Sequence, residues 1–334
     1  MLPVIFGLAG PVLGDEERAF FREADPAGFI LFARNCETHA QLRALTDALR
    51  DAVGRESLAV LIDQEGGRVA RMKPPEWPEF PAQKSFAALY EKAPISGMEA
   101  ARVNAEALGV MLAEAGINVD CLPLLDIPQP GADEIIGDRA LGDEPLRVAA
   151  LGRYVLDGLE AGGCIGVVKH IPGHGRAGAD SHKRLPVVDA SDEELEIDLA
   201  PFRALAGAPM GMTAHVLYSA WDKARCASAS PAIIANVIRG RIGFDGFLMS
   251  DDIGMEALDG SPAERAAAVV AAGCDAALHC SGDLEEAKAV ATALAAMGEA
   301  SESRLAAALA RTGKVSLHTL AALAEKRDRL LGYS

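Results

Sequence analysis

Residues 169–188, KHIPGHGRAGADSHKRLPVV, contain three of the seven histidines in the chain. His170 and His174 are four residues apart, a spacing that suits two metal ligands on one helix face. A proline and a glycine between them prevent such a helix, so only a loop could bring them to a metal. Asp180 and His182 suit acid–base chemistry better, because a nearby carboxylate can hold one imidazole nitrogen and orient the ring.

A second group of reactive side chains lies in LMSDDIGMEAL, residues 248–258. Asp251 and Asp252 follow an apolar run, so one carboxylate can point into a site while the other points away. A carboxylate that faces a general acid across a sugar-sized gap is the arrangement used in glycoside hydrolysis. Two alternatives remain: a non-catalytic sugar-binding protein, and a metal-dependent hydrolase that uses His170, His174 and His182.

The elements that must position these residues are eight short apolar runs, each followed by polar or glycine-rich residues and a helical pattern. The runs are continuous and not alternating, as expected of strands covered on both faces. Eight alternating β and α units predict a single closed (β/α)₈ barrel of the TIM type, with no second α/β domain. The runs begin at Val4, Gly28, Leu58, Ile117, Cys164, Met210, Gly246 and Cys274.

Helix signals between the runs support this prediction. Capping patterns begin at Thr38, Ser191 and Ser261. We expect one barrel domain over residues 1–334, whose tail from residue 282 onward is helical. A long insertion between the third and fourth runs keeps an open, doubly wound sheet as the alternative fold.

Several polar residues fall at or just after the ends of the predicted strands. Parallel barrels hold their active sites at the carboxyl ends of their strands. We therefore expect the following side chains to converge on one site: Asp63, Asp126, Lys169, His170, His215, Asp251 and His279.

Composition narrows the classes of partner and compartment. The net charge of −16 over 334 residues argues against nucleic acid and against anionic membrane surfaces as partners. No apolar run approaches the ~20 residues of a membrane span, and the N-terminal apolar run has no basic residues before it, unlike a signal peptide. The six cysteines are scattered, which predicts reduced thiols and a cytoplasmic protein.

Five ordered motifs give the chain a resemblance to a known family. LIDQEGGRVARM, KHIPGHG followed by DSH, MTAHV, LMSDDIGMEAL and GFILFARN lie between about residues 4 and 280, and EIDLAPF at residues 196–202 also matches. Together they resemble the family 3 glycoside hydrolases, specifically the β-N-acetylglucosaminidases of bacterial cell-wall recycling.

The resemblance implies an exo-acting, retaining β-N-acetylhexosaminidase that releases N-acetylglucosamine from muropeptides through a covalent glycosyl-enzyme. It implies that Asp251 is the nucleophile and that His182, with Asp180 as its partner, is the general acid and then the general base. It also implies a set of sugar-binding residues, Asp63, Arg71, Arg139, Lys169 and His170. His174 could brace the loop, and His215 could line the pocket floor or be a core histidine.

The same resemblance sets expectations for cofactors and partners. We expect no metal or other cofactor, no nucleic acid, no membrane insertion and a monomeric chain. Residue types alone leave β-glucosidase, β-xylosidase and phosphorylase activities open within the same family.

Overall fold

The parallel barrel is present in the computed structural model, which describes residues 1–181 and 184–333. Within these residues, eight strands close in the order β1-β10-β9-β7-β5-β4-β3-β2, with every neighbouring pair parallel. This confirms the predicted (β/α)₈ barrel, and the open-sheet alternative was wrong. The strands are β1 (Leu2–Gly7), β2 (Pro26–Leu31), β3 (Ala59–Ile62), β4 (Val119–Asp120), β5 (Ile165–Ile171), β7 (Met210–Thr213), β9 (Phe247–Asp252) and β10 (Ala276–His279).

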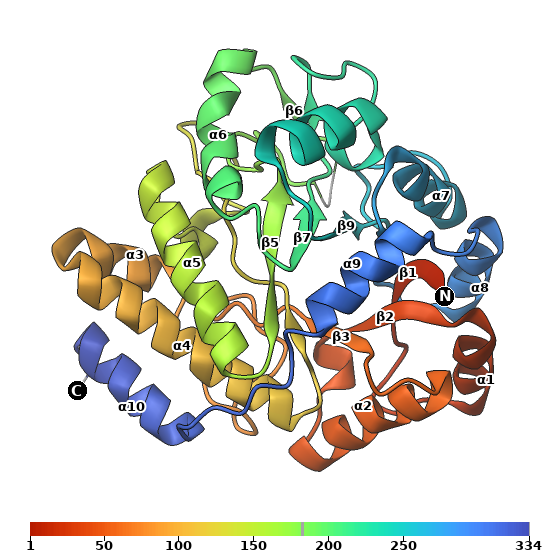
Figure 1. Cartoon of the computed structure of the whole chain (residues 1–334), viewed down its shortest axis with the longest axis horizontal. Helices are drawn as coiled ribbons and strands as arrows, with labels where there is room; N and C mark the ends of the chain where they lie inside the picture. Colours follow the sequence, from red (N-terminus) through yellow and green to blue (C-terminus); the bar gives the residue numbers. More distant parts are fainter. Residues whose placement is uncertain (182–183, 334) are drawn as a thin grey trace.

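Helices surround the barrel, as Figure 1 shows. Capping boxes start α2, α6 and α7 at Thr38, Ser191 and Ser261, as the sequence predicted. None of the helices in the described ranges combines the length and apolar character needed to cross a bilayer. The helices are α1 (Asp15–Ala24), α2 (His39–Val53), α3 (Gln83–Lys92), α4 (Pro94–Glu114), α5 (Pro145–Ala161), α6 (Asp192–Ala204), a π-helix (Ile233–Ile242), α7 (Pro262–Ala272), α8 (Leu284–Ala293), α9 (Glu299–Leu309) and α10 (Leu320–Leu331).

The inside of the barrel is filled by apolar side chains from all eight strands, and residues of α9 complete this inner core. Asp275, just before β10, binds Ser301 Oγ at 2.5 Å and Arg304 Nη2 at 2.6 Å. These bonds hold α9 at the amino ends of the strands. The carboxyl ends are therefore the open end of the barrel. In Figure 1, α10 lies apart from α9 and beside α4.

A small parallel ribbon, β6 (Val187–Val188) with β8 (Leu217–Tyr218), was not predicted. It lies close to the loop that follows β5. The Tyr218 hydroxyl donates to the Gly173 carbonyl at 2.6 Å, and Arg176 Nε donates to Asp198 Oδ2 on α6 at 2.6 Å. A Cβ on Gly175 would lie 1.9 Å from the Ile127 carbonyl oxygen, so only glycine allows this approach.

Candidate active site

A cavity of about 230 Å³ opens at the carboxyl ends of the barrel strands. Its walls come from β2, β5, β7, β9 and β10 and from the loops that follow β3, β4 and β5. Seven of the predicted site residues line it. These are Asp63, Arg71, Arg139, Lys169, His170, His174 and Asp251.

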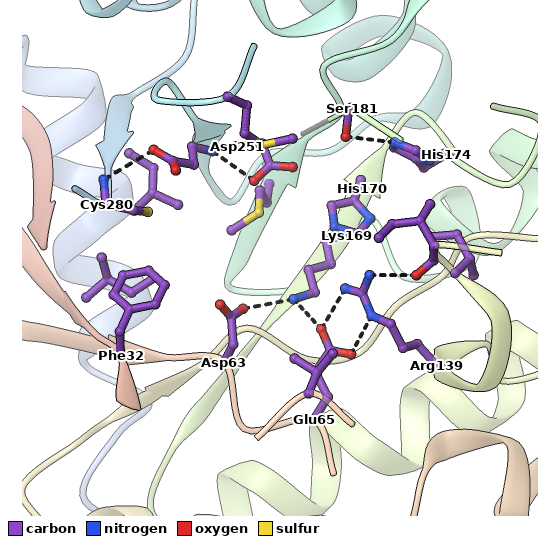
Figure 2. Close-up of a pocket in the computed structure, with 18 of the residues that line it drawn as sticks. Phe32, Asp63, Glu65, Arg139, Lys169, His170, His174, Ser181, Asp251 and Cys280 are labelled. Carbon is purple, nitrogen blue, oxygen red and sulfur yellow. Dashed lines mark hydrogen bonds and ion pairs between the residues drawn. The ribbon is translucent and has the colours of Figure 1, made fainter. Parts of the chain in front are cut away.

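One wall of the cavity is a chain of alternating charges (Figure 2). Lys169 Nζ, on β5, lies 3.1 Å from Asp63 Oδ1 and 2.7 Å from Glu65 Oε1. Glu65 also pairs with both Nε and Nη2 of Arg139, at 2.9 and 2.8 Å. At the other end of this chain, Arg71 Nη2 donates a hydrogen bond to Asp63 Oδ2 at 3.0 Å. Three cations and two carboxylates therefore present fixed hydrogen-bonding groups to a ligand.

These pairs keep all their members charged. Burial raises the pKa of the Asp63 carboxyl, but the charges of Lys169 and Arg71 more than offset this and lower it below its usual value. Burial likewise acts against the charge on Lys169, and Glu65 and Asp63 raise the pKa of that ammonium above its usual value. A charged lysine and a charged aspartate suit the binding of sugar hydroxyls, which both donate and accept hydrogen bonds.

Asp126 orients the His170 ring by binding its Nδ1. The sequence predicted Asp126 at the site but gave it no role. His170 Nδ1 lies 2.7 Å from Asp126 Oδ2, and Asp126 Oδ1 accepts the His174 backbone N–H at 2.6 Å. Burial raises the pKa of Asp126, but the two histidines outweigh it and lower the pKa to about 2. The carboxylate fixes which nitrogen of His170 faces inward, leaving Nε2 for a ligand.

His174 is buried beside the cavity, and its Nε2 lies 3.3 Å from Ser181 Oγ. This contact agrees with the prediction that His174 braces the loop. Burial, reinforced by the neighbouring His170, lowers the pKa of His174 to about 4. The imidazole is therefore neutral at physiological pH.

Replacing His174 with glutamine is expected to flatten the pH dependence of stability. Between pH 6.5 and 4 the unfolded chain protonates this imidazole while the native chain does not, so native stability falls as the pH is lowered. The lost free energy of unfolding amounts to roughly 3 kcal/mol over that range. Urea unfolding at several pH values measures it, with the exposed His318→Gln as the control; equal slopes in wild type and His174→Gln would contradict this account.

Asp251 lies on β9, on the side of Figure 2 opposite the charged chain. Its Oδ1 accepts the Asp252 backbone N–H at 2.8 Å. Burial raises its pKa, but His170, His215, the Asp252 amide and Lys169 together lower it below the usual value. The carboxylate is therefore ionised at neutral pH, as a nucleophile must be.

The loop after β5 carries Asp180 and Ser181, and Ser181 lines the cavity. Asp180 is half-buried. His182 lies outside the described residues, so its pairing with Asp180 stays a prediction.

Two strand-end histidines are not in the cavity. His279 Nε2 lies 3.3 Å from Glu286 Oε2 on α8, and the ring packs edge-on against Phe6. His215 is fully buried, with Nδ1 2.6 Å from Ser228 Oγ and Nε2 3.0 Å from the Asp252 carbonyl. The expectation that these two rings converge on the site was therefore wrong, and of the two roles left open for His215 the core position is the one found. His215 is a core histidine that supports the strand bearing the two aspartates.

Two residues that shape the site, Glu65 and Phe32, were not among the predicted site residues, and Asp126 was expected at the site without a role. Glu65 received no role, although it lies two positions after Asp63 in the quoted motif, a spacing that returns to the same face of an extended segment. Asp126 orients His170, and Phe32 forms an apolar wall beneath the Arg71 guanidinium, 5.3 Å from its ring centre.

A metal-dependent hydrolase would need several ligand side chains gathered around one ion. The described part of the chain contains no group of three or more His, Cys, Asp or Glu side chains arranged to hold a metal ion. The alternative ligand set includes His182, which lies outside that part.

Comparisons with known proteins agree with the geometry. A family profile described as "Glycosyl hydrolase family 3 N terminal domain" matches residues 12–315. A β-hexosaminidase of Alkalilimnicola ehrlichii is 40% identical over 287 residues, which cover 83% of this chain and 80% of the relative. The crystal structure of NagZ from Neisseria gonorrhoeae in complex with N-trifluoroacetyl-D-glucosamine has 29% identity and a TM-score of 0.88, covering 99% of this chain and 97% of that one. NagZ from the same organism has also been solved in complex with zinc ion, at 28% identity, a TM-score of 0.86, and the same coverage of 99% and 97%.

Proposed function

The chain belongs to glycosyl hydrolase family 3, and from this we propose that it is an exo-acting, retaining β-N-acetylhexosaminidase. Its substrate would be a muropeptide fragment that ends in N-acetylglucosamine. The observation that carries the proposal is the pairing of two features in one cavity: the ionised carboxylate of Asp251 and, across from it, the charged chain from Asp63 to Arg139.

In the proposed reaction, one sugar occupies the cavity with its hydroxyls against Asp63, Lys169 and Arg139. An oxygen of Asp251 attacks the anomeric carbon as the bond to the leaving oxygen breaks, and His182 gives that oxygen a proton. A covalent glycosyl-enzyme results. His182 then takes a proton from water, the water oxygen attacks the same carbon, and Asp251 leaves as a carboxylate.

The cavity's dimensions and position support exo action. A space of about 230 Å³ at the end of a barrel is suited to one terminal sugar rather than to an extended polysaccharide. The cavity walls come from a single chain, so the expected monomer remains compatible with a complete site.

We also propose a cytoplasmic location. Cys36, Cys121, Cys164, Cys226, Cys274 and Cys280 are all free thiols. Free thiols are typical of reducing compartments.

Turnover of p-nitrophenyl N-acetylglucosaminide, compared with p-nitrophenyl glucoside, tests the proposal. We expect hydrolysis of the N-acetylglucosaminide, with the same rate in the presence of phosphate and after treatment with a chelator. Faster turnover of the glucoside would indicate a β-glucosidase, and a sugar phosphate as product would indicate a phosphorylase.

The two remaining alternatives have their own outcomes in this assay. Loss of activity on chelation, with metal in the purified protein, would favour the hydrolase that uses His170, His174 and His182. Binding of N-acetylglucosamine without any hydrolysis would favour a sugar-binding barrel.

A further inference from the structure

Glu65 is a buried carboxylate whose oxygens are occupied by cations. Its side chain is 1% exposed. Oε1 accepts from Lys169 Nζ at 2.7 Å and from Arg139 Nη2 at 2.8 Å, while Oε2 accepts from Arg139 Nε at 2.9 Å. A carboxylate that already accepts three charge-assisted hydrogen bonds is poorly placed to accept more from a ligand.

The backbone holds Glu65 at one position. Its N–H donates to the Val69 carbonyl at 3.0 Å, and its carbonyl accepts from Gln83 Nε2 at 2.6 Å. Gly66 follows with φ of 91°, and a Cβ there would lie 2.4 Å from the Pro81 carbonyl oxygen. This tight turn leaves the carboxylate little freedom to follow a moving partner.

Arg139 depends on this carboxylate more than Lys169 does. Lys169 has a second anion, Asp63, at 3.1 Å. Among the described residues, Glu65 is the sole carboxylate paired with Arg139, and the remaining bond of that guanidinium is from Nη1 to the Ile135 carbonyl at 3.1 Å. The bidentate pair fixes the plane of the guanidinium and therefore the directions of its free N–H groups.

We propose that Glu65 is a positioning residue that holds Arg139, and secondarily Lys169, in the orientation needed to bind the hydroxyls of the terminal sugar. This inference rests on the proposed function. Hydrogen bonds to the sugar that strengthen in the transition state require donors that are already in place, because reorienting a buried cation during the reaction is costly.

The loop that carries Arg139 has other anchors, so loss of Glu65 should not unfold it. Arg68 Nε donates to Asp138 Oδ1 at 2.8 Å and its Nη2 to the Ile135 carbonyl at 2.6 Å. We therefore expect a Glu65→Gln variant to lose the fixed orientation of the Arg139 guanidinium while the loop that carries Arg139 retains its conformation.

The test compares Glu65→Gln with a matched control, Glu99→Gln. Glu99 also bridges an arginine and a lysine, Arg102 at 3.0 Å and Lys326 at 2.6 Å. It lies on α4, facing α10, and is not among the residues that line the cavity. We expect Glu65→Gln to lower kcat/KM by about 10²-fold, and to weaken binding of N-acetylglucosamine in calorimetry. Glu99→Gln should leave both values within about 2-fold of wild type, since an ion pair this exposed contributes little.

A double-mutant cycle separates positioning from other roles. In an Arg139→Ala background, Glu65→Gln should cost only a small further factor, because Glu65 acts mainly through Arg139 and Lys169 keeps Asp63 as a partner. The two apparent pKa values read from the pH profile of kcat/KM should be the same in Glu65→Gln and in the wild type. The proposal would be overturned if Glu65→Gln lowered kcat/KM as much in the Arg139→Ala background as in the wild type, or if it shifted an apparent pKa of the profile.

The positioning role can be tested even if the proposed function fails or if Glu65→Gln does not fold. If the wild type proves inactive, the proposed function fails, while the calorimetric effect of Glu65→Gln on N-acetylglucosamine binding still supports or overturns the positioning role. If Glu65→Gln does not fold, Glu65→Asp is used in the same cycle: it keeps the charge but its shorter side chain should lose the bidentate pair.

Discussion

The Asp251→Ala variant should hydrolyse p-nitrophenyl N-acetylglucosaminide at least ~10⁴-fold more slowly than the wild type. The variant has no group to form the covalent intermediate, while the charged wall that binds the sugar is intact. Steady-state kinetics should therefore show a collapse of kcat, with little change in the affinity for N-acetylglucosamine measured by calorimetry.

The neighbouring aspartate provides the control. Asp252 Oδ1 accepts the backbone N–H groups of Gly254 at 2.9 Å and Cys280 at 3.2 Å, so its carboxylate is engaged in holding two loop ends. Asp252 also lines the cavity, but these two bonds give its carboxylate a structural role. Asp252→Asn should lose much less activity than Asp251→Asn, and the reverse order would contradict the assignment of the nucleophile.

The second large effect is expected at His182. If this imidazole is the general acid and base, His182→Ala should lose ~10²–10⁴-fold in kcat/KM on substrates with poor leaving groups. A p-nitrophenolate leaving group needs little protonation, so on that substrate the first step should be much less affected.

Hydrolysis of the glycosyl-enzyme should then limit the rate of His182→Ala. Azide should restore turnover, because the anion attacks the anomeric carbon without a base and forms a glycosyl azide. His318→Ala, at an exposed histidine, is the control. A loss that is independent of the leaving group, with no rescue by azide, would contradict the role of His182.

The barrel could be predicted because its signal is local and repeated. Strands such as β5 and β9 begin as apolar runs and carry ionisable residues near their carboxyl ends, and capping boxes mark several of the helices between the strands. The β6–β8 ribbon has no such signal, because two-residue strands are too short for a pattern. Its pairing is set by the approach of two loops after the barrel has formed.

Within the site, the strand-end rule located the reactive residues but not the direction of each side chain. Successive residues of a strand point to opposite faces. Leu278 lines the cavity, so the next residue, His279, points outward to the helices. The sequence does not show which face is inside until the register is known.

The role of Glu65 could not be predicted for a different reason. Its motif was recognised, but its partner Arg139 is 74 positions away in the chain. A buried carboxylate and an exposed one have the same sequence signature, and only the folded contact distinguishes them.

Mass spectrometry of the enzyme after reaction with a 2-fluoro glycosyl fluoride tests the central assignment most directly. Trypsin would release residues 242–265, a peptide that contains both Asp251 and Asp252, so fragmentation must place the added sugar. We expect the sugar as an ester on Asp251. A label on Asp252, or slow turnover with no covalent adduct on any residue, would contradict the account.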